Sequence, residues 1–275
     1  MINHTPEERQ SIKERGRQIR FELFEKFCRI QEGHPGSILS IFDIVNVLYL
    51  GGYVDLGKKS VDNNDVFIMS KGHAAAVQYP YLVEKGVLPD KEWDNWGREE
   101  SCLRVFGNHS IPGVDVTSGS LGHGIGIASG MALANRMNKE DHKIYVVISE
   151  GELYEGSSWE AFLFIAHHKL AEVKIILDVN RNMILGRPED NLKLESLDKK
   201  FEAFDIDVMR INGHDYDEIF KGLNFLEESV EKPRVLIADT IKGKGVSFME
   251  DTAQSHYWGN LSEEQMATML KDLSA

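Results

Sequence analysis

Short apolar runs and longer stretches of helical periodicity alternate along this chain. Runs rich in β-branched residues predict buried strands at 66–70, 144–148, 174–177, 205–211 and 234–239. Between and around them, apolar residues recur with helical spacing at 7–29, 40–50, 125–136, 159–170, 197–204, 216–226 and 261–273. This order predicts an α/β fold, with a mostly parallel sheet and helices on both faces.

Two strand ends in the middle of the chain carry the first chemical signal. Glu150 follows the strand at 144–148, and Asn180 follows the strand at 174–177, with one helix between. The strands of such a unit are parallel neighbours, so both side chains are expected at the sheet edge where α/β proteins bind ligands. Their oxygens suit Mg²⁺. An acidic surface loop and a turn asparagine would give the same spacing, so both interpretations stay open at this point.

Composition narrows the class of protein. The chain has 275 residues, 42% of them apolar, which is enough for one large domain over residues 1–275. The formal net charge of −13 argues against nucleic acid or an anionic membrane as a partner. Two cysteines, Cys28 and Cys102, form no CxxC pair, and neither a signal peptide nor a membrane-spanning run is evident. We therefore expect a cytoplasmic protein.

The residues around Glu150 and Asn180 resemble a known signature. Gly-Glu-Leu-Tyr-Glu-Gly-Ser-Ser-Trp-Glu-Ala begins at Gly151, and Asp-Val-Asn-Arg follows at 178–181. Together they resemble the thiamine diphosphate signature of transketolases, in which an Asp, an Asn and a nearby main-chain carbonyl hold the metal on the cofactor. The resemblance implies thiamine diphosphate with Mg²⁺, Ca²⁺ or Mn²⁺ as cofactors. The implied metal ligands are Glu150, Asn180 and the carbonyl of Asn182, and Gly151, Glu152 and Asn180 would contact the cofactor.

The metal position departs from the family in one residue. Glu150 stands where the family has Asp, and it reaches about 1.5 Å further because of its extra methylene. Mg²⁺ demands near-ideal octahedral geometry, but the charge is kept. We expect metal binding to survive, with loss of the metal as the alternative.

Further strings resemble the same family. They are Gly-His-Pro-Gly-Ser at 33–37, Ser-Lys-Gly-His-Ala-Ala at 70–75, Ser-Gly-Ser-Leu-Gly at 118–122 and Lys-Gly-Lys-Gly-Val-Ser-Phe-Met-Glu at 242–250. Glycines in such turns let backbone N–H groups approach a phosphate closely, although many helices simply begin this way. The resemblance implies substrate-side histidines at His34, His73, His109 and His256, and cofactor contacts at Ser118, Gly119, Ser120 and Leu121.

The resemblance also implies a division of labour between chains. Full-length transketolases continue with a pyrimidine-binding domain, which supplies the glutamate that activates the cofactor, and a C-terminal domain. This sequence ends soon after the resemblance does, near residue 260. We expect the diphosphate- and metal-binding subunit of a two-chain transketolase, active only with a C-terminal partner subunit carrying both missing domains. Two chains of each kind would form a heterotetramer that transfers a two-carbon ketol unit between sugars or sugar phosphates.

Two alternatives remain open from the sequence. The first is a transketolase-like subunit that acts on an unusual sugar in a specialised biosynthetic pathway. The second is a non-catalytic subunit that binds or regulates a partner, which Glu150 favours and the many cofactor-side strings oppose.

Overall fold

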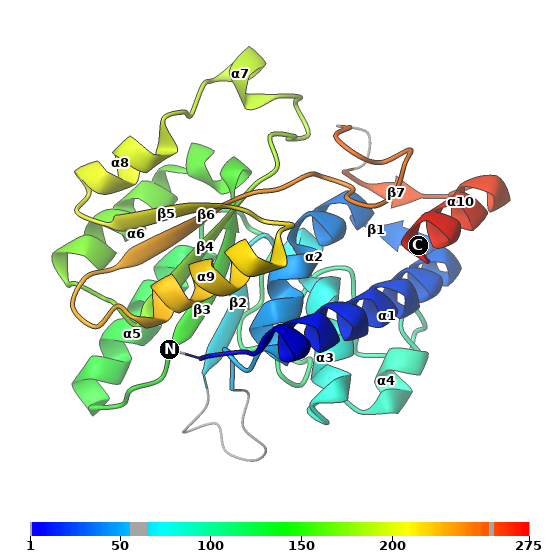
Figure 1. Ribbon diagram of the computed structural model, residues 1–275, viewed down its shortest axis with the longest axis horizontal. Helices are drawn as coiled ribbons and strands as arrows, with labels where there is room; N and C mark the ends of the chain where they lie inside the picture. The colour runs from blue at the N-terminus through cyan, green and yellow to red at the C-terminus, as the bar shows by residue number, and fades with distance from the viewer. Residues whose placement is uncertain (1, 56–64, 253–255, 275) are drawn as a thin grey trace.

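A five-stranded sheet forms the centre of the molecule (Figure 1). This computed structural model describes residues 2–55, 65–252 and 256–274. Every neighbouring pair in the sheet is parallel, and the spatial order is β2-β3-β4-β6-β5. The expected α/β class is therefore confirmed. The strands are β2 (Val66–Met69), β3 (Ile144–Ser149), β4 (Val173–Val179), β5 (Asp207–Asn212) and β6 (Arg234–Asp239).

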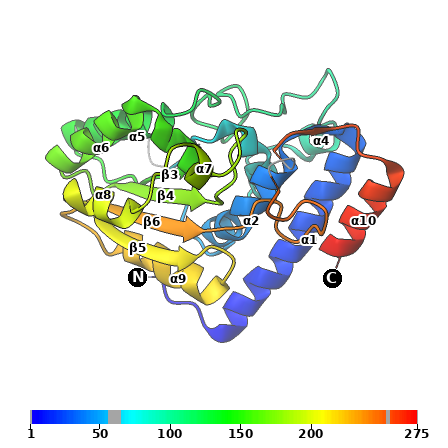
Figure 2. The same cartoon turned by 90° about the horizontal axis from the view of Figure 1, so that it is seen from above.

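Helices cover both faces of this sheet (Figure 2). Successive side chains of a strand point to opposite faces, so the mostly apolar central strands contribute to two separate cores. In β3, for example, Tyr145 and Val147 belong to one core and Val146 and Ile148 to the other. One face carries α5 (Gly124–Asn138), α6 (Gly156–His167) and α8 (Leu197–Ala203), and the other carries α1 (Pro6–Ile30), α2 (Pro35–Leu50), α3 (Tyr79–Glu84), α9 (Tyr216–Glu227) and α10 (Glu263–Leu273).

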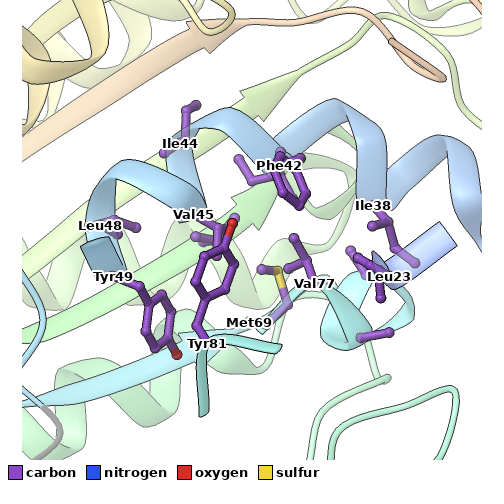
Figure 3. Packing of buried hydrophobic residues seen from close by; sticks show 14 of the residues in the cluster. Leu23, Ile38, Phe42, Ile44, Val45, Leu48, Tyr49, Met69, Val77 and Tyr81 are labelled. Carbon is purple, nitrogen blue, oxygen red and sulfur yellow. The ribbon is translucent and has the colours of Figure 1, made fainter. Parts of the chain in front are cut away.

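Helix α2 lies inside the molecule and is buried on all sides. Its residues from Pro35 to Tyr49 are all buried, and they contact α1, α9 and the segment η1 (Gly72–Gln78). Figure 3 shows Phe42, Val45 and Tyr49 of α2 against Val77 and Tyr81. The Tyr49 and Tyr81 rings stack with centroids 5.2 Å apart. A helix that is apolar all round is typical of the core of a large domain.

The start of α2 differs from the sequence prediction. The apolar spacing predicted a helix over 40–50, but the helix begins at Pro35 with His34 at its N-cap. Proline is tolerated in the first helical turn because the N–H it lacks would have no partner there. The predicted start of the helix was wrong by five residues, and Ser37 therefore lies on the same helix as Ser40.

The remaining elements are short. The segment η2 (Glu150–Tyr154) follows β3 directly, α4 (Asp90–Asp94) and α7 (Pro188–Asn191) interrupt loops, and β1 (Glu32–Gly33) pairs antiparallel with β7 (Trp258–Gly259). The pairing of β1 with β7 joins residues far apart in the sequence, and no local pattern predicts it. Within the described ranges, no helix has both the length and the apolar character that a bilayer crossing requires.

Candidate active site

A cavity of about 560 Å³ opens at the carboxyl ends of the strands. Glu150 follows β3 and Asn180 follows β4, and the register pairs Ser149 of β3 with Asp178 of β4. Lys71 follows β2 and Lys242 follows β6 at the same edge. The predicted site residues that line this cavity are His34, His73, Gly119, Leu121, Glu150, Gly151, Asn180, Asn182 and His256.

Three imidazole rings meet on one side of the cavity. The ring centroids of His34, His73 and His256 lie 5.1–5.2 Å from one another in every pair. They arrive from the N-cap of α2, from η1 and from the segment before β7. The pairing of β1 with β7 brings the last of these beside His34. The structure thus places together three histidines that are 39 and 183 positions apart in sequence order.

Burial keeps these histidines neutral. Burial, together with the Lys242 charge, lowers the pKa of His34 to about 4 and that of His256 to about 3. Burial and the Lys71 charge also lower the pKa of His73 well below its ordinary value. A neutral imidazole offers one donor and one acceptor nitrogen. The Nδ1 atom of His34 is buried and has no hydrogen-bond partner among the described residues, so it is available to a ligand.

Lys242 contributes an ammonium group that the sequence analysis did not single out. Its Nζ donates to the carbonyl oxygen of Asn182 at 2.8 Å and to Nδ1 of His256 at 3.0 Å. That contact leaves the ring proton of His256 on Nε2. Lys242 forms no ion pair with any described carboxylate, and burial lowers its pKa to about 8. The cavity therefore contains a positive charge that the chain itself does not neutralise.

Glu150 contributes a carboxylate that likewise has no oppositely charged partner among the described residues. Its side chain is buried, and its Oε2 accepts a hydrogen bond from the backbone N–H of Arg181 at 2.8 Å. It makes no ion pair within the described part of the chain, and burial raises its pKa to about 7. Asn180 Oδ1 accepts only from the N–H of Asn182, at 3.1 Å. Oxygens from all three predicted metal ligands are thus present at one strand edge, each with a lone pair to spare.

A buried ion pair lies beneath these groups. Asp178, which is fully buried, pairs with Lys71 and accepts hydrogen bonds from the hydroxyls of Ser40 and Thr240. Burial would raise the pKa of Asp178, but the Lys71 ammonium and these donors hold it below its ordinary value. The amide of Asn180 donates to Ser40 Oγ at 3.1 Å and to Asp178 at 3.3 Å. The network therefore fixes the orientation of Asn180.

Glycines form a third wall of the cavity. Gly119 has a φ of +137°, which side chains rarely allow. A Cβ on Gly72 would come within 2.6 Å of the Gly119 nitrogen, so the two segments can meet only without a side chain there. The Gly-rich string therefore approaches η1 closely, and its contact with a cofactor stays a prediction.

Four predicted site residues do not line the cavity. Ser118 lies against Gly72 and Gly107. The exposed Ser120 hydroxyl contacts His123 Nδ1 at 3.1 Å. Glu152 is fully buried and accepts from Ser70 and from the N–H groups of Gly122 and Ser149. His109 is exposed and bonds Thr117 Oγ1 at 2.8 Å. Glu152 thus joins the segments of Ser70, Gly122 and Ser149 by hydrogen bonds. A substrate role for His109 stays a prediction.

The remaining wall is apolar and comes from the loop after β4. Met183 and Gly186 form an isolated antiparallel bridge, and the turn between them exposes Ile184 and Leu185 at the cavity rim. Arg187 pairs with Asp251 at 2.7 Å and anchors this loop to the segment after β6.

These residues fit a metal held on a diphosphate. Among the residues that the structure describes, no group of three or more His, Cys, Asp and Glu side chains could hold a metal. The site instead offers one unpaired carboxylate with amide and carbonyl oxygens, a donor set that suits a hard cation retaining ligand phosphates. The unpaired Lys242 ammonium suits the phosphates themselves.

Parallel-sheet topology, a strand-end oxygen site and clustered neutral histidines together define a cofactor-binding α/β domain. Comparison with known proteins gives its family. The chain matches the model of the transketolase thiamine diphosphate-binding domain over residues 12–274. It is 35% identical, over 97% of its length, to one subunit of the apulose-4-phosphate transketolase from Phocaeicola vulgatus and covers 93% of that protein. The chain therefore belongs to the transketolase family.

Two further comparisons define its extent within that family. A 6-deoxy-6-sulfo-D-fructose transketolase subunit from a Clostridium species is 32% identical, with 97% of this chain and 98% of that protein covered. The crystal structure of Campylobacter jejuni transketolase superimposes with a TM-score of 0.88 at 31% identity, covering 96% of this chain. The chain spans only 43% of that enzyme, so it corresponds in length to the subunits and to less than half of the undivided transketolase.

Proposed function

We propose that this chain is the thiamine diphosphate- and metal-binding subunit of a two-chain transketolase. The observation that carries the proposal is that one cavity contains two charged groups without ion-pair partners among the described residues, the Glu150 carboxylate and the Lys242 ammonium. Three neutral imidazoles lie beside them. A divalent cation would neutralise the first group and a diphosphate the second. The chain's family supports the same cofactor.

Specific residues would hold the cofactor and metal. Glu150, Asn180 Oδ1 and the Asn182 carbonyl would bind the metal, and the backbone of Gly119, Leu121 and Gly151 would face the diphosphate. Lys242, which donates to the Asn182 carbonyl in this structure, would turn its ammonium from that carbonyl to the diphosphate. Mg²⁺ is the ion we expect, with Ca²⁺ and Mn²⁺ as alternatives. When bound, thiamine diphosphate supplies the carbon centre that carries a two-carbon ketol unit between sugars.

The histidines would act on the substrate's hydroxyl groups. Neutral imidazoles both donate and accept, so His34, His73 and His256 can orient a polyhydroxylated chain and take or return a hydroxyl proton. Lys242 fixes the tautomer of His256, whose Nε2–H is then a donor. Such proton transfer typically contributes about 10²–10⁴-fold to a rate.

A partner subunit would complete the site. On α5 and α6 the chain exposes Ile127, Met137, Leu163 and Phe164, of which Met137 is 77% and Leu163 58% exposed. Exposed apolar groups on adjacent helices are typical of an interaction surface. We propose that this α5–α6 surface is buried in a heterotetramer with two partner chains that carry the pyrimidine-binding and C-terminal domains.

The sugar is the second open point. The relatives act, by their names, on apulose 4-phosphate and on 6-deoxy-6-sulfofructose. These names favour a specialised sugar over a common one as the substrate of this chain. Screening donor and acceptor sugars with the reconstituted pair tests this choice, and efficient turnover of common pentose phosphates alone would contradict it.

Thermal unfolding tests the cofactor proposal without any activity measurement. Thiamine diphosphate with Mg²⁺ at about 100 times its dissociation constant should stabilise the chain by ~2.7 kcal/mol. Glu150→Asp is measured in parallel with the unmodified chain, because this variant keeps the carboxylate charge and restores the side-chain length that the family has at this position. Stabilisation of both proteins supports a working metal site. Stabilisation of the Asp variant alone would favour the non-catalytic interpretation.

The partner requirement needs a separate measurement. Ketol transfer should be detectable only when this chain is mixed with its partner subunit, because the glutamate that activates the cofactor is expected there. Robust ketol transfer by this chain alone would contradict the two-chain proposal while leaving cofactor binding intact.

A further inference from the structure

A second cavity, of about 210 Å³, lies on the side of α2 that faces α1 and the start of α9. It shares no lining residue with the cofactor cavity. After β6 the chain crosses α2 before it returns to α10 beside α1 (Figure 2). The charged lining residues are Lys13, Arg17 and Arg20 of α1, Lys244 of the crossing segment, and one acid, Asp43 of α2. Four basic residues around one acid stand out in a chain with a formal net charge of −13.

The single acid is already engaged by other groups. Asp43 Oδ2 lies 2.8 Å from His214 Nδ1, and its other oxygen accepts from the Tyr216 hydroxyl at 3.3 Å. His214 Nε2 accepts the N–H of Ile241 at 2.9 Å, so the ring proton is on Nδ1 and points at Asp43. Asp43 therefore bonds the turn before α9 and the first residue of that helix, and it does not neutralise the basic residues of α1.

Two of the basic side chains have no acidic partner. No described carboxylate lies within ion-pair distance of Lys13 or Arg20. The Arg20 guanidinium carbon lies 5.9 Å from the Phe42 ring centroid, and Lys13 Nζ lies 5.5 Å from that of Tyr216. Arg20 Nε is buried and has no hydrogen-bond partner in the described part of the chain. Aromatic faces position these cations, and their N–H groups remain available.

The other two basic residues have only weak pairs. Arg17 lies 3.8 Å from Glu14, and Lys244 lies 3.1 Å from Glu250, with all four side chains about a third exposed or more. Exposed pairs of this kind contribute little and can exchange partners. Residues 13, 17 and 20 share one face of α1, so their charges converge on the same volume.

We infer that this cavity binds a small dianion, namely inorganic phosphate or the phosphate group of a phosphorylated metabolite. The planar fork of Arg20 matches two phosphate oxygens, and Lys13 and Lys244 add point charges. A volume of about 210 Å³ is below that of typical sites for larger ligands, so the ligand is a phosphate group with little else attached. The formal net charge of −13 argues against nucleic acid as the source of the phosphate.

Calorimetric titration of the full chain with inorganic phosphate at low ionic strength tests this inference. Arg20→Gln and Lys13→Gln should each weaken binding about tenfold, as expected for loss of one charge-assisted hydrogen bond. Lys85→Gln, which removes an exposed lysine outside this cavity, should leave binding unchanged. Lys242→Gln reports on the cofactor cavity and should leave this site intact.

The outcomes separate the possible sources and failures. Loss of binding in Lys242→Gln with normal binding in Arg20→Gln would overturn the inference, as would no binding to the unmodified chain. Tighter binding of glycerol phosphate than of inorganic phosphate would identify a phosphorylated metabolite, and equal binding would identify free phosphate. If Arg20→Gln fails to fold, Lys13→Gln and the charge-preserving Arg20→Lys still decide the question.

Discussion

Asp178 and Glu150 are two buried carboxylates at the ends of adjacent strands, and the chain treats them in opposite ways. Asp178 is enclosed by the Lys71 ammonium and two hydroxyl groups, and its pKa is held below its ordinary value. Glu150 receives one backbone N–H, and burial raises its pKa to about 7. The difference shows which carboxylate belongs to the architecture and which needs a cation from outside the chain.

The same contrast holds for the two lysines. Lys71 donates to Asp178 and to the carbonyl of Ser37, and it is fully buried. Among the described residues, the Lys242 ammonium donates hydrogen bonds to one carbonyl and one imidazole and to no carboxylate. Asp178 and Lys71 thus form an ion pair within the fold, whereas Glu150 and Lys242 form none with any described residue. A metal bound to a diphosphate would neutralise both of the latter groups.

The largest expected effect comes from breaking the Asp178–Lys71 ion pair. Asp178→Asn would leave the Lys71 charge buried without a counterion and should destabilise the fold by about 3–5 kcal/mol. Urea unfolding at neutral pH measures this loss. Glu150→Gln is the matched control, because it removes a carboxylate that has no ion pair. An equal loss in both variants would contradict the distinction between the two carboxylates.

The next effect is the pH dependence of the histidine cluster. The folded-state pKa of His34 is about 4, below its ordinary 6.5, so its contribution to stability is present above pH 6.5 and is lost as the pH falls toward 4. The full loss is roughly 3 kcal/mol, at 1.36 kcal/mol per unit. Urea unfolding at pH 7 and 4.5 should show a smaller difference in His34→Gln.

Glu150 opposes that trend and must be removed to see it clearly. Its folded-state pKa is raised, so its contribution to stability is full below pH 4.5 and is lost as the pH rises through about 7. The His34→Gln comparison is therefore made in a Glu150→Gln background. An unchanged pH profile in that background would show that His34 is accessible to water and protonates freely.

Removal of the Glu150 carboxylate should abolish metal-dependent stabilisation. Glu150→Gln should lose most of the ~2.7 kcal/mol that thiamine diphosphate and Mg²⁺ provide at 100 times the dissociation constant. Thermal unfolding with and without EDTA gives the metal-dependent part. An Asn191→Ala variant, altered elsewhere in the cavity wall, should keep that part. Full stabilisation of Glu150→Gln would show that oxygens other than those of the Glu150 carboxylate hold the metal.

The smallest effect is expected at His109. Within the described residues the exposed His109 ring hydrogen-bonds Thr117 alone, so His109→Ala should change stability by at most about 0.5 kcal/mol. In the reconstituted enzyme its rate loss should be well below the 10²–10⁴-fold expected for His34→Ala. A loss as large as that of His34→Ala would place His109 in the substrate site once the partner is bound.

Local patterns were sufficient for the sheet but not for the site. The sequence runs predicted all five strands of the sheet. Strands β2, β3, β4 and β6 are mostly apolar because they are buried in a parallel sheet, whereas β5 lies at the edge and is only half-buried. The parallel pairing of β3 with β4 then placed Glu150 near Asn180 as expected. His34, His73 and His256 came from resemblance alone, since no periodicity reports that three distant turns meet.

The missed residues share a physical reason. Asp178 is, with Lys174, one of two charged residues in the otherwise apolar strand Val173–Val179, and a charge inside a buried run was the available signal at this position. Its partner Lys71 could not be found the same way, because it stands in a Gly-rich turn where polar residues are common. Lys242 gains its role from the crossing of α2 by the segment after β6, where the Gly243 N–H bonds the Gly36 carbonyl at 3.0 Å. Such contacts depend on tertiary packing rather than on neighbours in sequence.

The complete burial of α2 sets how the two sides of the cavity can move. His34, Ser37 and Ser40 belong to this helix or its cap, and their backbone opens to solvent only when the core itself comes apart. The opposite rim, with the exposed Ile184 and Leu185, is tied to the rest of the chain by a short bridge and a surface ion pair. Amide hydrogens of α2 are therefore expected to exchange mainly through global unfolding, and those of the rim through local opening. A ligand entering the cavity would thus meet one wall that opens at the cost of the whole fold and another that opens at the cost of a few local contacts.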